Sequence, residues 1–168
     1  MILRHIDTRP SAVPGPATPA AAGRSVDFGL EAQVQHPLNV ILPLKNPTQM
    51  PALLALLASC ADDVNQALVS LHYVHFARFL PSPDGSVLMV ITAYDGNLES
   101  YIMDFVGVLG DVFTQILQYI ADAPRLPVQR HAREFTQFIV DHNVSPVPLF
   151  SAYQDVTVID ILRSARQL

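Results

Sequence analysis

The sequence predicts an α+β protein in which elements in the order βαββαβ build one antiparallel sheet with helices on one face. Two stretches, residues 50–71 and 101–120, repeat apolar side chains at helical steps of three and four. Two aromatic and branched runs, 72–80 and 86–94, flank a turn with the sequence PSPDG, which is typical of a β-hairpin. An alternating apolar run precedes the first helix and predicts the first strand.

The chain divides into an arm and a domain. Residues 1–35 form a Pro/Ala-rich N-terminal arm, because the stretch 9–23 reads RPSAVPGPATPAAAG and has little to bury. Within this arm Val26, Phe28 and Leu30 alternate and predict a short edge strand. Residues 36–168 form the predicted domain.

The first half of the domain follows in order. Residues 38–44 alternate apolar side chains and predict the first strand, which Pro43 ends or confines to an edge. Residues 50–71 predict one continuous helix, and 72–80 with 86–94 predict the hairpin. In the helix 101–120, Gly107 and Gly110 lower helix propensity and indicate a close approach to another backbone.

The second half adds an amphipathic helix at 131–143, a last strand at 147–153 and a terminal helix at 156–168, capped by Asp155 or Thr157. With the extra helix set aside, the order βαββαβ is that of a ferredoxin-like fold.

Both faces of the predicted sheet are mostly apolar. The strand 86–94 presents Val87, Met89, Ile91 and Ala93 on one face and Leu88, Val90, Thr92 and Tyr94 on the other. Helices cover one face, and a second copy of the chain would cover the other, so we expect a homodimer that pairs through the sheet face. The alternative is that the arm and the C-terminal helices cover this face within one chain.

Composition excludes several classes of partner. The formal net charge is -5, with ten Lys and Arg against fifteen Asp and Glu and no basic run, which argues against nucleic acid and anionic membrane surfaces. No apolar stretch reaches the roughly 20 residues of a membrane span. The single cysteine, Cys60, lies in an apolar helical pattern and predicts a buried thiol in a cytoplasmic protein.

Four residues are candidate ligand-binding residues: His75, Arg78, Tyr94 and Asp95. His75 and Arg78 lie three apart on one strand and are expected to point to opposite faces unless a bulge intervenes. Arg78 would hold an anionic group or pair with a nearby acid. Asp95 ends a strand ahead of a helix, where it serves either an anion site or an ordinary turn. Tyr94 belongs to the core or to a pocket.

Three histidines are candidate haem ligands: His75, His131 and His142. His131 and His142 flank a predicted helix and lie eleven residues apart, about three turns. No metal site is predicted, because no histidine pair has the HxxxH or HxxEH spacing, and no nucleophile elbow or phosphate loop occurs. His75 is otherwise interpreted as a hydrogen-bonded core histidine.

The segment HYVHFARFLPSPDGSVLMVITAYDGNLESYIMDF at 72–105, with FSAYQDVTVIDIL at 150–162, resembles bacterial proteins with a dimeric α+β barrel domain, loosely similar to the dye-decolorising peroxidases and chlorite dismutases. The resemblance implies a ferredoxin-like subunit, a homodimer and a haem peroxidase site. In the peroxidases a GxxDG motif supplies the distal aspartate, and here the matching stretch begins with Thr92 and places Asp95 at that position.

Three functions remain open at this point. The first is a dimer that binds a small molecule or haem, including a peroxidase-like oxidoreductase, with His75, Arg78 and Asp95 at its pocket. The second is a non-enzymatic structural or interaction protein whose apolar sheet face is only an interface. The third is a cofactor-free monooxygenase. A polar residue in a real cavity favours the first and third, and a barrel filled with apolar side chains favours the second.

Overall fold

The structure, a computed structural model, describes residues 34–144 and 149–166 of the 168-residue chain. Most of the predicted arm, including the edge strand at 26–30, lies outside the described residues. The strands are β1 (Gln35–Pro43), β2 (Val74–Pro81) and β3 (Val87–Asp95). The helices are α1 (Met50–Ser59), α2 (Ala61–Leu71), α3 (Leu98–Leu117), α4 (Ala132–Asp141) and α5 (Val158–Ala165), with short 3₁₀ turns at Pro47–Gln49 and Val128–Arg130.

The predicted α+β class is confirmed by a three-stranded antiparallel sheet in the order β1-β3-β2. Because β1 and β2 both run antiparallel to β3, which lies between them, they are parallel to each other and form a split βαβ unit. The hairpin between β2 and β3 is confirmed as well. Its turn is held by Asp84, whose carboxylate accepts hydrogen bonds from Ser82 and Ser86.

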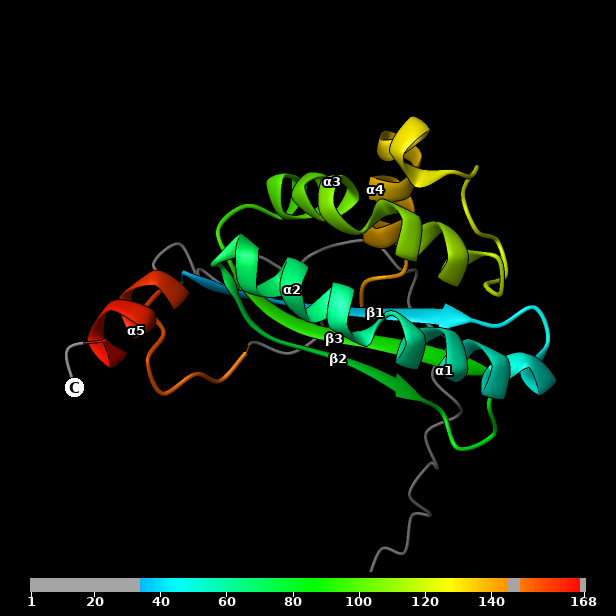
Figure 1. Cartoon of the computed structure of the whole chain (residues 1–168), viewed down its shortest axis with the longest axis horizontal. Helices are drawn as coiled ribbons and strands as arrows, with labels where there is room; N and C mark the ends of the chain where they lie inside the picture. The colour runs from blue at the N-terminus through cyan, green and yellow to red at the C-terminus, as the bar shows by residue number, and fades with distance from the viewer. Residues whose placement is uncertain (1–33, 145–148, 167–168) are drawn as a thin grey trace, which may run out of the picture.

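Helices α1, α3 and α4 pack on one face of this sheet, and α5 lies apart at one end (Figure 1). The core between the layers contains Leu38, Val40 and Leu42 of β1, whose alternation was visible in the sequence. Opposite them lie buried side chains of three helices: Leu53, Tyr101, Ile102, Val106, Ile116, Phe135 and Ile139. The apolar periodicities of strand and helices therefore meet in one core, as the sequence predicts.

The expected helix 50–71 is broken at Cys60 into α1 and α2, whose axes bend by 57°. The Ser59 hydroxyl donates to the Leu56 carbonyl and offers the last turn of α1 a side-chain partner. Asp62 and Asp63 then lie in the first turn of α2, where carboxylates favour a new helix N-terminus. Periodicity alone missed this break because the apolar stripe continues through it.

The expected strand at 147–153 is not formed in its described part. Residues 145–148 lie outside the described residues, and 149–155 run as irregular chain and turn. Pro146 and Pro148 lack the amide hydrogen that a ladder requires. Near this segment the Val144 amide still donates to the Asn39 carbonyl, and the Val34 amide donates to the Gln154 carbonyl.

The chain therefore contacts the open edge of β1 at two separated points. A full βαββαβ sheet is not formed by the described residues.

α3 is long and apolar enough to cross a membrane by length and composition, and the bent pair α1–α2 passes the same test as a single span. Half of the apolar window of α3 is buried inside the molecule. Its buried side chains, among them Tyr101 and Ile102, pack on the sheet, so α3 fits the role of a core helix.

Candidate functional site

The sheet has a second face that α1–α4 do not cover, and we call it the far face. The β1–β3 register pairs Leu38 with Thr92 on the core side, so the residues that alternate with them, such as Ile91, point to the far side. The same holds along β2, where Arg78 pairs with Ile91. The far face thus carries Pro37, Asn39, Ile41, Phe76, Arg78, Leu80, Val87, Met89, Ile91, Ala93 and Asp95.

A β-bulge in β2 changes the orientation expected for His75. The pairing passes from Val74 opposite Tyr94 directly to Phe76 opposite Ala93, so His75 is the extra residue of the bulge. The expectation that His75 and Arg78 point to opposite faces is therefore wrong. The bulge shifts the alternation by one residue and places both side chains on the far face.

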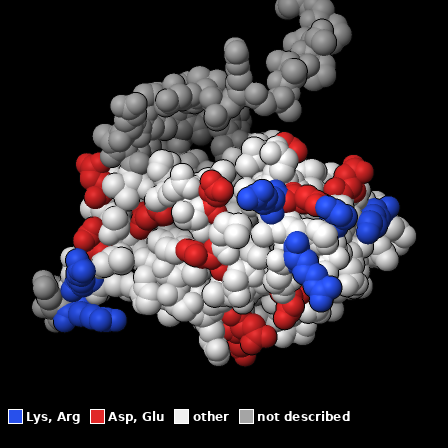
Figure 2. Space-filling model, turned by 90° about the horizontal axis from the view of Figure 1, so that it is seen from above, with Lys and Arg blue, Asp and Glu red and all other residues white. Residues whose placement is uncertain are grey.

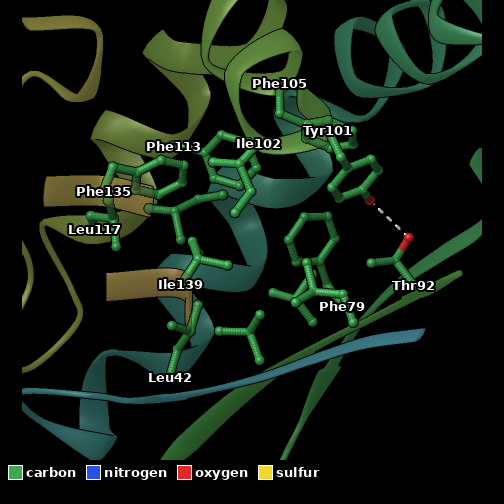
Figure 3. A pocket seen from close by; sticks show the side chains of 14 residues that line it. Leu42, Phe79, Thr92, Tyr101, Ile102, Phe105, Phe113, Leu117, Phe135 and Ile139 are labelled. Atoms are coloured by element: carbon green, nitrogen blue, oxygen red, sulfur yellow. Dashed lines mark hydrogen bonds between the residues drawn. The ribbon is translucent and has the colours of Figure 1, made fainter. Parts of the chain in front are cut away.

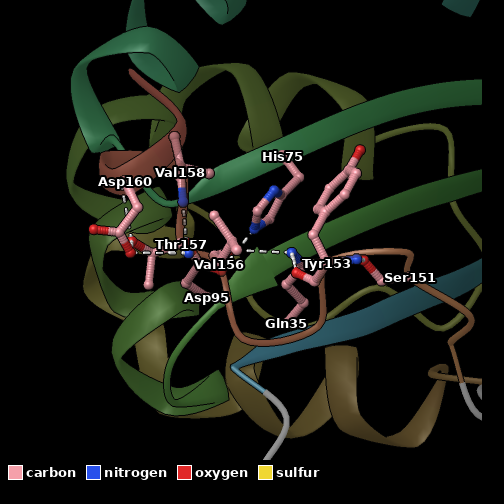
Figure 4. Close-up of polar contacts among 9 residues, drawn as sticks. All are labelled: Gln35, His75, Asp95, Ser151, Tyr153, Val156, Thr157, Val158 and Asp160. Carbon is pink, nitrogen blue, oxygen red and sulfur yellow. Dashed lines mark hydrogen bonds and ion pairs between the residues drawn. The ribbon is translucent and has the colours of Figure 1, made fainter. Parts of the chain in front are cut away.

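His75 and Asp95 form a nearly buried pair at one end of the far face (Figure 4). The imidazole Nε2 lies 2.6 Å from Asp95 Oδ1, and the two side chains are 10% and 9% exposed. The other carboxylate oxygen of Asp95 accepts a hydrogen bond of 2.8 Å from the Val158 amide at the start of α5. Asp95 thus orients the imidazole and holds the first turn of α5, whereas its expected place was ahead of the next helix along the chain, which is α3.

A second tether lies next to this pair. The side-chain amide of Gln35 donates to the carbonyl oxygens of Tyr153 and Val156, at 3.0 and 2.9 Å. Gln35 pairs with Asp95 across the β1–β3 ladder, so both tethers act at the same end of the sheet (Figure 4). The segment Tyr153–Val158 therefore covers this end of the far face. This agrees in part with the alternative that C-terminal residues cover the face within one chain.

Arg78 is exposed and has no ion pair with any acid of residues 34–144 and 149–166. Among the described residues of the three strands, Asp95 is the only acidic side chain that points to the far face. Of the two predicted roles for Arg78, pairing with an acid is thus not observed among the described residues. Its guanidinium is available to an anionic group.

Tyr94 does not belong to this site, although it precedes Asp95. Its side chain points to the core side, where its ring stacks on Tyr101 at a centroid distance of 4.0 Å. Burial raises the pKa of the Tyr94 phenol to about 12. Of the two interpretations of Tyr94, the core one holds.

An apolar cavity of about 50 Å³ lies between the sheet and the helices (Figure 3). Its walls are mainly leucines, isoleucines, valines and phenylalanines, and the hydroxyls of the two polar lining residues, Tyr101 and Thr92, bond to each other at 3.0 Å. Ligand sites for drug-sized molecules span roughly 300–1,000 Å³. This cavity is therefore a packing void of the core and cannot hold haem.

The candidate haem ligands are not arranged as a haem site. His131 and His142 lie at opposite ends of α4, about 15 Å apart along a ten-residue helix. His142 Nδ1 contacts the Phe138 carbonyl at 2.8 Å, and His131 lies 3.6 Å from Glu134. In His75 the nitrogen farther from the backbone, Nε2, is bound by Asp95, which leaves Nδ1 beside Cβ for a ligand. Within the described residues the three histidines therefore do not gather at one point, and His75 offers a ligand only its Nδ1 atom.

Sequence reasoning missed two members of the site. Gln35 lay at the boundary of the arm, and nothing in its neighbours indicated a contact with residues more than a hundred positions away. The bulge at His75 has no glycine to mark it, so the alternation of the run HYVHFARFL concealed it. Among the described residues, no three His, Cys, Asp or Glu side chains gather as a metal site.

Fold and site together define an α+β protein in which the sheet face that α1–α4 do not cover carries an Asp-oriented histidine and an arginine without an ion pair among the described residues. No family model, no curated protein and no solved structure matches this chain. The resemblance to dye-decolorising peroxidases and chlorite dismutases therefore stays a prediction.

Proposed function

We propose that this protein is a homodimer that binds a small organic anion between the far faces of two sheets, at Arg78 and His75. The observation that carries the proposal is the guanidinium of Arg78, which has no ion pair within residues 34–144 and 149–166 and lies on a mostly apolar face beside the His75–Asp95 pair. The ligand we expect has an apolar body and a carboxylate or similar anionic group.

The dimer follows from the composition of the far face. Ile41, Met89, Ile91 and Leu80 lie side by side on three strands, and Phe76 is 46% exposed. Contiguous apolar surface on a small domain usually marks an interaction site. If two such faces pack together, the apolar side chains of both are buried and the helices of both copies lie outside. This is the arrangement of a dimeric α+β barrel.

The proposed subunit is ferredoxin-like. The observed order β1-β3-β2 supports this, because it contains the split βαβ unit of that fold. The contacts of β1 with His142 and Val144, and of Val34 just before β1 with Gln154, support a further segment of chain beside β1, the position that the last strand would take.

The anionic class of the ligand follows from the dimer. Pairing the two faces would remove Arg78 from water, and a buried charge without a partner is costly. The described strands of a second copy bring no free acid, since their far-face carboxylate, that of Asp95, is bound to His75 and Val158. A ligand carboxylate would supply the missing charge through two parallel hydrogen bonds.

His75 contributes a second polar contact. Because Asp95 fixes the ring through Nε2, the nitrogen Nδ1 has a defined direction and can exchange a hydrogen bond or a proton with the ligand. An aspartate-oriented histidine is a common general base. The His75–Asp95 pair is therefore the feature that favours the cofactor-free monooxygenase alternative, in which a base would deprotonate the substrate.

The interaction-protein alternative has an observation of its own. Asp95 and Gln35 both hold the C-terminal segment, so the His75–Asp95 pair also has a purely structural role at the end of the sheet. On this alternative the far face binds a second copy and no ligand.

A thermal-shift titration with benzoate, phenylacetate and inorganic phosphate separates these functions. We expect saturable stabilisation by an aromatic carboxylate, lost in Arg78→Gln and kept in Arg130→Gln, a control at another exposed arginine. Stabilisation that is equal in both variants would contradict the Arg78 site, and no stabilisation by any probe would favour the interaction protein.

Hemin serves as a parallel probe of the haem alternative. We expect no saturable change of the Soret band, and the same weak signal in His75→Ala, His131→Ala and His142→Ala. One-to-one binding that a single alanine variant abolishes would restore the haem site.

A further inference from the structure

α5 is an amphipathic helix whose apolar side is left uncovered by the described residues. Val158, Ile161, Leu162 and Ala165 share one side, and the exposed fractions of Ile161 and Leu162 are both 39%. No residue of α5 belongs to the core. A helix of eight residues is marginal in water by itself, so its apolar side needs a partner surface.

Among the described residues, the hydrogen bonds that attach α5 to the sheet lie at its N-terminus, where Asp95 accepts a hydrogen bond from the Val158 amide. Thr157 and Asp160 cap the same end of the helix through a capping box. Beyond this point α5 runs outward at one end of the molecule, clear of the helix layer (Figure 1). α5 with Arg166, which we call the C-terminal arm to distinguish it from the N-terminal arm 1–35, is thus anchored on the far-face side of the sheet.

The helix layer carries a groove between α2 and α3 that matches such an arm. Gly107 lies on the groove, and a Cβ at this position would meet no atom within 4 Å, so another helix can approach closely. Val108 of α3 is 47% exposed at the groove. The groove is therefore open, has small residues in its floor and offers apolar contact.

The charges of groove and arm are complementary. Helices α1, α2 and α3 contain Asp62, Asp63, Glu99, Asp104 and Asp111 and no Lys or Arg. Asp63 and Asp111 line the groove itself. The C-terminal arm carries Arg163 and Arg166, while the one acid of α5, Asp160, forms part of the capping box. Figure 2 shows Lys and Arg at the lower left and on the right of the visible face, with acidic side chains between these two groups and also beside those on the right.

We propose that α5 docks into the α2–α3 groove of a second copy of this chain, with Ile161 and Leu162 against Val108 and the two arginines beside Asp63 and Asp111. The groove of the same chain lies on the opposite side of the sheet from the anchor at Asp95. A helix of eight residues is only about 12 Å long, so a neighbouring copy is the partner that the anchor favours.

Disulfide trapping tests this contact in the full-length chain. Leu162→Cys and Val108→Cys are placed in separately tagged chains, both with Cys60→Ala, and mixed with oxidised glutathione. We expect a disulfide between the unlike chains, and little of it when Val140→Cys on α4 replaces Val108→Cys. Equal trapping by both partners, or none, would overturn the proposal. So would a disulfide within one chain when both cysteines are placed together.

Charge exchange gives a second readout that needs no cysteine. A chain with Asp63→Arg and Asp111→Arg and a chain with Arg163→Asp and Arg166→Asp should each lose the arm contact, and mixing them should restore it as a heteromer. A separate substitution on the far face, Ile91→Arg, should break the proposed pairing of the two sheets and leaves these charged residues untouched. Failure of one interface is thereby distinguished from failure of the other. Absence of any heteromer would count against the arm.

Discussion

At the residue scale, Asp95 links three separate elements through hydrogen bonds. Its carboxylate binds the imidazole of His75 and the amide of Val158, and its own amide donates to the Tyr73 carbonyl at 2.8 Å. One side chain thus joins β2, β3 and α5. The sequence placed Asp95 at a strand end near a helix N-terminus, but only the structure shows that the helix is α5, more than sixty residues later.

Asp95→Asn should lower the free energy of unfolding by roughly 1–3 kcal/mol, because a charged acceptor of two hydrogen bonds becomes neutral. Urea unfolding followed by circular dichroism measures this change. Asp155→Asn, in the exposed turn just before α5, serves as the control and should change stability little. Equal stability of wild type and Asp95→Asn would show that the tether contributes nothing.

Three tyrosines make the fold sensitive to alkaline pH. Burial is the main cause that raises the pKa of Tyr73, Tyr94 and Tyr101, that of Tyr94 to about 12. The unfolded chain ionises its phenols near their ordinary value of 10, while the folded chain still holds these protons. Stability is therefore undiminished by these groups below pH 10 and falls as pH rises towards the folded pKa values.

An alkaline titration that follows tyrosinate absorbance together with circular dichroism checks this. We expect part of the absorbance to appear only as the fold is lost. Ionisation of all five tyrosines with the fold intact would contradict the burial of the three.

At the element scale, the two glycines of α3 have different surroundings. A Cβ at Gly110 would lie 2.6 Å from the Gln129 side chain, whereas Gly107 faces open space. The predicted close approach thus exists at Gly110, with a side chain as the neighbour in place of a backbone. At Gly107 the described residues supply no neighbour.

Gly107→Ala should stabilise the chain by about 0.5–1 kcal/mol, since alanine is the better helix former and meets no clash. Gly110→Ala should gain less or lose stability, because Gln129 must move away from Asp111, to which it donates a hydrogen bond of 2.7 Å. Thermal unfolding of the pair measures the difference. An equal change in stability for Gly107→Ala and Gly110→Ala would contradict the different surroundings of the two glycines.

The elements that sequence predicted well are those with a long, regular period. α3, α4, the hairpin and β1 all appear within a few residues of their expected ends, because buried side chains on one face impose the pattern. The errors lie where local structure departs from the periodic pattern. Ser59 helps to end α1, a bulge reorients His75, and residues 149–155 run as irregular chain and turn where a strand was expected.

The site was predictable in part. His75, Arg78 and Asp95 were singled out by residue type, and all three do lie on one face. Their grouping was not predictable, since it depends on one extra residue in β2. Gln35 acts through backbone carbonyls of a distant segment, for which a single sequence carries no signal.

At the scale of the whole molecule, the two faces of the sheet give two different expectations for similar substitutions. Val90 points to the core side and lines the inner cavity, so Val90→Arg should destabilise the fold by about 3–5 kcal/mol through an unpaired buried charge. Ile91 points to the far side, where an arginine leaves the core unchanged. Far-ultraviolet circular dichroism and thermal unfolding compare the two.

The molar mass of the wild-type protein and of Ile91→Arg in solution, measured by light scattering after gel filtration, tests the central claim most directly. The proposed dimer predicts twice the 18.4 kDa chain mass for the wild type and the mass of one folded chain for Ile91→Arg. A wild type of one chain mass, or an Ile91→Arg variant as large as the wild type, would contradict pairing through the far face.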